Sequence, residues 1–334
     1  MRVVLTTPHL RISGGVKVIL TVANGLHKMG VHTTVIATKS KHTDLEWFLD
    51  DVKFDLIYLE NVQKHRKSIS AANCMVEHYG CKKLPAFSGP RVLYFQGVPP
   101  CEEGQATNLR SVSIDPEYKH VITTSKWLEN IVKDKVQVPT TVIPPGIDPI
   151  FVPQAVPHSK PLTIGTLYHP SKDKNFQFFL TTIIRLYTKY KIRAYPVILA
   201  GSHIEKIPIL DYYCLPYSII YRPPQGVLPY VYSSCDIWLS PSVIEGFGLT
   251  TLEAMACGVP TLWVPSFGLE EYMITGKNCI VVDSPKSAAK FVYKIKDNDL
   301  YLHDLSVRGM KTAARFRWDN TITQIHDLLK SVHK

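Results

Sequence analysis

The chain has 334 residues, of which 45% are hydrophobic and 20% charged, and its formal net charge is +10. This composition is typical of a soluble globular protein with about two domains. No apolar run approaches the roughly 20 residues of a membrane-spanning helix, and no signal-peptide pattern opens the chain. We therefore expect a cytoplasmic protein, with a peripheral attachment to a membrane left open.

The basic excess favours an anionic partner: a nucleotide, a membrane surface or nucleic acid. A basic surface that is only solvated explains the charge equally well. Lys and Arg exceed Asp and Glu by 18 to 14 in residues 1–155 and by 20 to 14 in residues 156–334, so the excess is spread over both halves. The seven cysteines have no paired metal-ligand spacing and are odd in number, which favours a reducing compartment and predicts no metal site.

Strands and helices alternate along the first half of the chain. Gly14 and Gly15 follow the first strand and open the first helix, as in a mononucleotide-binding βαβ unit. A basic cluster at residues 64–67 is predicted to lie in a loop. The predicted strands are 3–6, 31–37, 54–59, 91–95, 120–124 and 140–143, and the predicted helices are 14–28 and one that begins at 125.

The pattern restarts after residues 153–161, which contain three prolines and are predicted to be a linker. Predicted strands follow at 162–165, 197–200, 218–221, 237–239, 261–264 and 279–282, with helices to about 190 and at 227–233, 250–256, 285–296 and 299–316. An amphipathic segment begins near Trp318. We expect an α/β protein with two doubly wound parallel sheets that face each other across a central cleft.

Residues 241–260 carry the strongest chemical signal. Gly246 and Gly248 punctuate a loop between a strand and a helix, and Thr250 with Glu253 has the spacing of a helix capping box. Glycines let the backbone approach a ligand, and a helix N-terminus attracts anions such as phosphate. Glu245 and Glu253 accept hydrogen bonds from hydroxyl groups, which sugars supply. The stretch therefore predicts a site for a ligand with both phosphate and sugar.

The same stretch resembles the donor-site signature of the GT4 family of retaining glycosyltransferases, Glu-x-Phe-Gly-x-x-x-x-Glu-Ala-Met-Ala-x-Gly-x-Pro, at nearly every position from Glu245 to Pro260. The resemblance covers most of residues 1–330 and implies the GT-B architecture. It implies an N-terminal acceptor-side domain at 1–155, a donor-binding domain at 156–316 and a helix at 317–334 that crosses back to the first domain.

By resemblance, Glu245 contacts sugar hydroxyls, Glu253 contacts the ribose, and Lys174 holds the diphosphate. The resemblance implies catalytic roles for Glu245, Lys174 and Gln96. The donor-binding set is Gly14, Gly15, Lys172, Lys174, Arg222, Glu245, Gly246, Phe247, Gly248, Leu249, Thr250 and Glu253.

The chain departs from the family pattern at two positions. Thr166 stands where an arginine is usual, with Lys172 as a possible substitute, and Gln96 stands where a histidine is usual. An amide cannot act as a base, and His9 and His78 are nearby candidates only in a loose sense.

We expect a metal-independent retaining glycosyltransferase that uses a nucleotide-sugar co-substrate and no resident cofactor. A glycan or lipid acceptor ranks first and a hydroxylated base in DNA second. A non-catalytic protein on the same fold that binds a nucleotide sugar or a polyanion is the alternative from another class. The sequence does not determine the base, the sugar, the acceptor or the oligomeric state.

Overall fold

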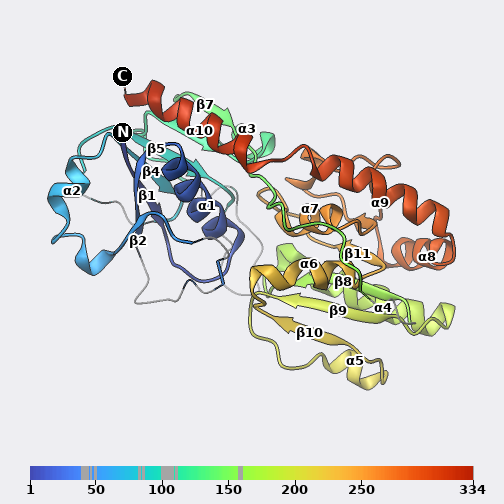
Figure 1. Cartoon of the computed structure of the whole chain (residues 1–334). Coiled ribbons are helices and arrows are strands. Elements are labelled where there is room, and N and C mark those ends of the chain that lie inside the picture. Colours follow the sequence, from blue (N-terminus) through green and yellow to red (C-terminus); the bar gives the residue numbers. More distant parts are fainter. Residues whose placement is uncertain are drawn as a thin grey trace. The chain divides into compact units, whose positions relative to one another are not determined.

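The computed structural model describes residues 1–38, 45, 47–48, 51–81, 84, 87–98, 109, 112–156 and 161–333. It divides into two compact units (Figure 1). The described residues of unit 1 fall within 1–98, 109–146 and 316–333, and those of unit 2 within 147–315. Part of the predicted proline-rich linker, residues 157–160, lies outside the described residues.

Unit 1 is built on a seven-stranded sheet in the order β3-β2-β1-β4-β5-β6-β7, and every pairing is parallel. Its elements are β1 (Arg2–Thr7), α1 (Gly14–Lys28), β2 (His32–Ala37), β3 (Asp55–Tyr58), η1 (Leu59–Asn61), α2 (Arg66–Ser70), β4 (Cys74–His78), β5 (Arg91–Phe95), β6 (His120–Thr123), α3 (Lys126–Lys133), β7 (Thr140–Val142) and α10 (Trp318–His333).

Helix α10 packs against α1 and β4 of unit 1, although it is the last element of the chain (Figure 1). The two helices approach so closely that a Cβ atom added at Gly25 would lie 2.1 Å from Ile322 Cδ1. Burial of Trp318, Ile322, Ile325 and Leu329 accounts for the amphipathic pattern of this segment.

Unit 2 repeats the architecture with a six-stranded parallel sheet in the order β10-β9-β8-β11-β12-β13. Its elements are β8 (Thr163–Tyr168), η3 (Lys172–Lys174), α4 (Phe176–Tyr190), β9 (Tyr195–Ala200), α5 (Pro208–Tyr212), β10 (Ser218–Tyr221), η4 (Gln225–Val227), α6 (Leu228–Ser233), β11 (Ile237–Ser240), α7 (Leu249–Ala256), β12 (Thr261–Trp263), η5 (Leu269–Glu271), β13 (Ile280–Val281), α8 (Pro285–Ile295) and α9 (Asp299–Ala313).

Three local predictions need correction. Strand β4 was not predicted, because this buried strand contains Glu77, whose charge obscures the apolar run. Arg91 on the neighbouring strand β5 pairs with this carboxylate at 2.5 Å, which makes the burial of both charges tolerable. Helix α5 was also missed, and part of the basic cluster at 64–67 lies in α2 rather than in a loop.

Both sheets have the strand order of doubly wound dinucleotide-binding folds. In such sheets the order reverses once, and ligands bind outside the carboxyl ends of the strands at that point. The reversal lies between β1 and β4 in unit 1 and between β8 and β11 in unit 2. Within the described part of the chain, none of the helices combines the length and hydrophobicity that crossing a bilayer requires.

Candidate functional site

The predicted phosphate-and-sugar site lies at the strand-order reversal of unit 2. Lys174 ends the 3₁₀ turn η3 that follows β8, and Glu245 lies in the loop that follows β11. Because β8 and β11 are neighbours in the sheet, these two loops start side by side. The backbone N–H of Val243 donates to the carbonyl of Asp173 at 2.8 Å, which ties one loop to the other.

Lys174 and Glu245 form an ion pair in which Nζ lies 2.7 Å from Oε2. The Lys174 side chain is 22% exposed and that of Glu245 is 14% exposed, so both groups are reachable from solvent while being held in place. The structure thus brings together a cation and a carboxylate that are 71 residues apart in sequence.

Two glycines fix the course of the loop between β11 and α7. Gly248 has φ of +82°, and a Cβ atom there would lie 2.4 Å from Leu269 Cδ2. Gly268 has φ of +90°, and a Cβ atom there would lie 2.3 Å from the carbonyl oxygen of Glu245. Only glycine combines this backbone conformation with such close contacts. Gly268 is a positioning residue for Glu245 that the sequence analysis did not identify.

Helix α7 begins at Leu249 with Gly248 as its N-cap and has no side-chain cap. The prediction that Thr250 caps this helix in a capping box with Glu253 is therefore wrong. The physical reason is that Gly248 adopts a left-handed conformation and caps the helix two residues before Thr250, and its carbonyl accepts from the N–H groups of Thr251 and Leu252. The first turn of α7 contains no acidic residue, and such a helix start suits an anionic ligand.

Glu253 points into a buried hydrogen bond rather than towards a cap. The hydroxyl of Tyr232 donates to Glu253 Oε2 at 2.8 Å, and both residues are buried. Burial raises the pKa of Tyr232 well above its usual value, and the neighbouring Glu253 carboxylate raises it further. The tyrosine therefore stays a hydrogen-bond donor, and it fixes the orientation of the carboxylate.

A second buried tyrosine, Tyr272, stabilises the loop between β11 and α7. Tyr272 follows η5, and its hydroxyl donates to the carbonyl of Gly248 at 2.7 Å. The ring of Phe247 packs at 5.3 Å from the Tyr272 ring. Burial raises the pKa of Tyr272 well above its usual value, with Glu245 adding to the shift, so this donor also persists at neutral pH.

Three further positions of unit 2 were singled out from the sequence. Lys172 is exposed and lies in the same 3₁₀ turn as Lys174. Thr166, at the position of the usual arginine, is fully buried, and its hydroxyl donates to Leu239 O at 2.9 Å to join β8 to β11. Arg222 has φ of +43°, donates to Gly201 O at 3.0 Å and lies over the Tyr221 ring, so its guanidinium is held at the end of β10.

In unit 1 the predicted Gly14, Gly15 and Gln96 also lie at the strand-order reversal. A Cβ atom added at Gly15 would lie 2.9 Å from His78 Nε2 and 3.5 Å from Gln96 Oε1, so the helix start, the end of β4 and the end of β5 meet there. The other ring nitrogen of His78 donates to Tyr79 O at 2.7 Å, which leaves Nε2 as the acceptor of the neutral ring. From the sequence, His78 was only a loose candidate for this position.

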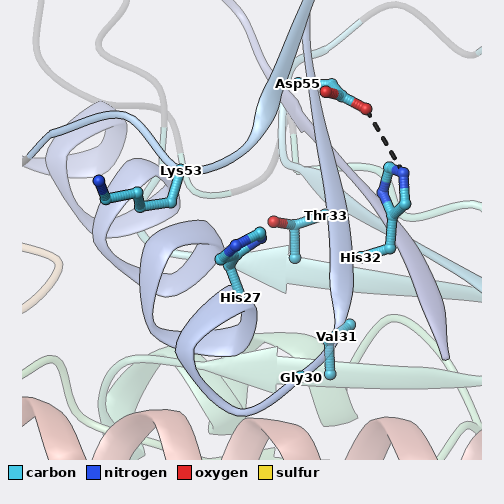
Figure 2. Close-up of a pocket in the computed structure, with 7 residues that line it drawn as sticks. All are labelled: His27, Gly30, Val31, His32, Thr33, Lys53 and Asp55. Atoms are coloured by element: carbon cyan, nitrogen blue, oxygen red, sulfur yellow. Dashed lines mark ion pairs between the residues drawn. The ribbon is translucent and has the colours of Figure 1, made fainter.

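A cavity of about 310 Å³ lies elsewhere in unit 1 (Figure 2). It is lined by His27 at the end of α1, by His32 and Thr33 at the start of β2, and by Lys53 and Asp55 before and at the start of β3. His32 Nε2 lies 3.6 Å from Asp55 Oδ2. The starts of β2 and β3 lie at one edge of the parallel sheet, and Gly14 and Gly15 lie at the opposite edge. This cavity is therefore separate from the candidate site.

Solved structures similar to this one include glycosyltransferases of the GT-B fold. One is Anabaena HepE, solved in complex with UDP and glucose, which matches with a TM-score of 0.79 and 14% identity over 99% of this chain and 100% of that chain. The expected fold class is confirmed: the chain consists of two doubly wound Rossmann-like α/β domains of the GT-B class.

Residues 159–298 match the family model described as glycosyl transferases group 1, which confirms the resemblance to GT4-like enzymes. A D-inositol 3-phosphate glycosyltransferase of Corynebacterium urealyticum is 31% identical over 113 residues, which are 33% of this chain and 26% of that protein. O-antigen chain mannosyltransferase B of Escherichia coli is 33% identical over 103 residues, 30% of this chain and 26% of that protein. The matched segments thus span about a quarter of the length of these relatives.

Proposed function

We propose that this protein is a retaining glycosyltransferase that moves a sugar from a nucleotide-sugar donor to a glycan or lipid acceptor. The observation that carries the proposal is the Lys174–Glu245 pair at the strand-order reversal, next to a helix start without a side-chain cap. A lysine and a carboxylate side by side match a ligand that presents a diphosphate and sugar hydroxyls together.

Each group has a distinct task in the proposed reaction. Negative charge grows on the leaving diphosphate, and Lys174 together with the amides at the start of α7 stabilises it there. Glu245 accepts hydrogen bonds from the donor sugar, and Glu253, oriented by Tyr232, accepts from the ribose. We infer that charge stabilisation by these groups replaces a metal ion and that no resident cofactor takes part.

The roles of Gly14, Gly15, Gln96, Lys172 and Arg222 remain predictions that rest on the resemblance. Thr166 is committed to the sheet, so Lys172 is the nearest candidate in sequence for the second cation of the diphosphate site. Within unit 1, His78 Nε2 and Gln96 Oε1 both lie close to Gly15 at the start of α1.

Thermal shift with a panel of nucleotides and nucleotide sugars, without added metal and at two salt concentrations, tests the proposal. UDP and UDP-glucose come first because HepE was solved with UDP and glucose. A ligand that binds the native state raises the melting temperature by mass action. A shift with one nucleotide series, followed by transfer to an acceptor, supports the function. The absence of any shift across the panel would contradict it and favour a non-catalytic protein.

A further inference from the structure

The basic excess of this protein is concentrated on two neighbouring helices of unit 2. Residues 176–196, which are α4 and the chain leading to β9, and residues 284–296, which are α8 with its flanks, contain eight Lys or Arg and no Asp or Glu. The other 300 residues carry 30 basic against 28 acidic side chains. These eight cations exceed the whole basic excess of residues 156–334, in which Lys and Arg outnumber Asp and Glu by 20 to 14, while residues 1–155 keep a smaller excess of their own.

The structure makes these two segments a single surface. Helices α4 and α8 pack against each other, and Figure 1 shows them side by side at the side of unit 2. Lys286, Lys290 and Lys294 recur every fourth residue along α8 and are exposed. Lys189, Lys191 and Arg193 are exposed at the end of α4 and just beyond it. We call this surface the α4–α8 face.

Tyrosines lie among these cations. Tyr190 of α4 and Tyr293 of α8 stack with ring centroids 4.7 Å apart, and Lys189 Nζ lies 5.4 Å from the centroid of the Tyr190 ring. Tyr293 is 48% exposed although it is a large aromatic residue. On the adjoining helix α5, Tyr212 is 78% exposed and packs edge-on against Tyr213, which in turn contacts Tyr187 of α4.

The acidic groups around the face are already engaged. Asp283, before α8, accepts hydrogen bonds from Ser284 and Ser287, and Asp297, after it, pairs with Lys296. Asp211 of α5 accepts from the Tyr217 hydroxyl. Helix macrodipoles account for basic residues in the last turn of each helix, but not for Lys286 in the first turn of α8. Among the residues that the structure describes, Lys286, Lys290 and Lys294 thus have no acidic partner.

We propose that the α4–α8 face binds a bilayer surface that contains anionic lipid. Flexible lysines suit the diffuse negative potential of such a surface, and exposed tyrosines suit its boundary between polar and apolar regions. Nucleic acid fits less well, since Tyr190 and Tyr293 stack on each other instead of presenting free ring faces to bases. This surface is distinct from the Lys174–Glu245 site, because all of its cations except Lys286 lie beyond the first turns of α4 and α8.

Vesicle sedimentation of the full chain tests the proposal, with phosphatidylcholine vesicles that contain or lack phosphatidylglycerol. We expect binding only to the anionic vesicles, and at least about a tenfold weaker partition for the triple variant Lys286→Gln, Lys290→Gln and Lys294→Gln. The matched control replaces three exposed lysines elsewhere, Lys64→Gln, Lys67→Gln and Lys311→Gln, and should retain most of the binding. Circular dichroism checks that both variants are folded.

Three results would overturn the proposal. The first is no binding of the parent protein to anionic vesicles, and the second is an equal loss of vesicle binding in the two triple variants. The third is that the α8 triple variant loses binding to a random-sequence DNA duplex but keeps its binding to anionic vesicles. The thermal shift of the α8 triple variant with nucleotides should equal that of the parent protein. Failure of the lipid proposal is therefore distinguishable from failure of the proposed transferase function.

Discussion

The ammonium group of Lys174 lies 2.7 Å from the carboxylate of Glu245, so the two groups proposed for diphosphate and sugar neutralise each other before any ligand binds. A ligand must therefore exchange this contact for its own. The pair also keeps both side chains oriented, which reduces the entropy that a ligand loses by ordering them.

This pairing predicts unequal effects of two substitutions. Lys174→Ala should weaken binding of a nucleoside diphosphate by about ten- to a hundredfold, since a charged hydrogen bond contributes about 1.5–3 kcal/mol. Glu245→Gln should leave that binding equal or tighter, because it releases the lysine, while it removes the preference for the nucleotide sugar. Isothermal titration with UDP and UDP-glucose measures both. Equal losses in the two variants for both ligands would remove the pair from the proposed site.

The Tyr232–Glu253 hydrogen bond predicts that substitutions at these two residues affect the stability of the protein and its binding of nucleotides differently. Tyr232→Phe leaves a buried carboxylate oxygen without this donor and should lower the free energy of unfolding by about 1–3 kcal/mol. Glu253→Ala should in addition weaken binding of a whole nucleotide much more than binding of pyrophosphate, which has no ribose. Urea denaturation and ligand titration check the two parts. A Glu253→Ala variant that is destabilised but binds nucleotides normally would show that the residue is only structural.

A side chain at Gly268 should displace Glu245, and a substitution at Gly276 serves as the control. Alanine is strained at both Gly268 and Gly276, where φ is +90° and +74°, and each substitution should cost about 1–2 kcal/mol of stability. Only at Gly268 does the new methyl group meet the Glu245 carbonyl, since Gly276 has open space around it. Donor binding should therefore fall in Gly268→Ala and persist in Gly276→Ala. Similar binding in both variants would contradict the positioning role.

His120 predicts a pH dependence of stability. Burial lowers the pKa of this half-buried histidine below its usual 6.5, and its Nε2 lies 2.9 Å from Thr141 Oγ1. As the pH falls below about 6.5, the unfolded chain takes up a proton that the native state does not, so stability decreases. His120→Gln should flatten this decrease in urea titrations between neutral and mildly acidic pH. The exposed His303→Gln is the control, and an unchanged slope in His120→Gln would contradict the assignment.

Local signals were sufficient for most elements of the fold. Apolar runs that alternate with amphipathic stretches predicted α1, α4, α8, α9 and most strands to within a few residues. Strand β4 was not predicted, because Glu77 is buried through its ion pair with Arg91, and Arg91 lies on another strand. The start of α7 was misplaced because Gly248 begins the helix through its positive φ, a property of the folded loop.

The sequence by itself determined the two doubly wound units and the composition of the loop from Glu245 to Thr250, because periodicity, glycines and charges are local properties of the chain. The tertiary structure alone decided that Lys174 faces Glu245, that Tyr232 orients Glu253 and that Gly268 braces the loop. It also decided that two segments about a hundred residues apart form one basic face. The physical reason is that parallel strands bring distant loops to one edge of a sheet, and sequence separation does not record which strands become neighbours.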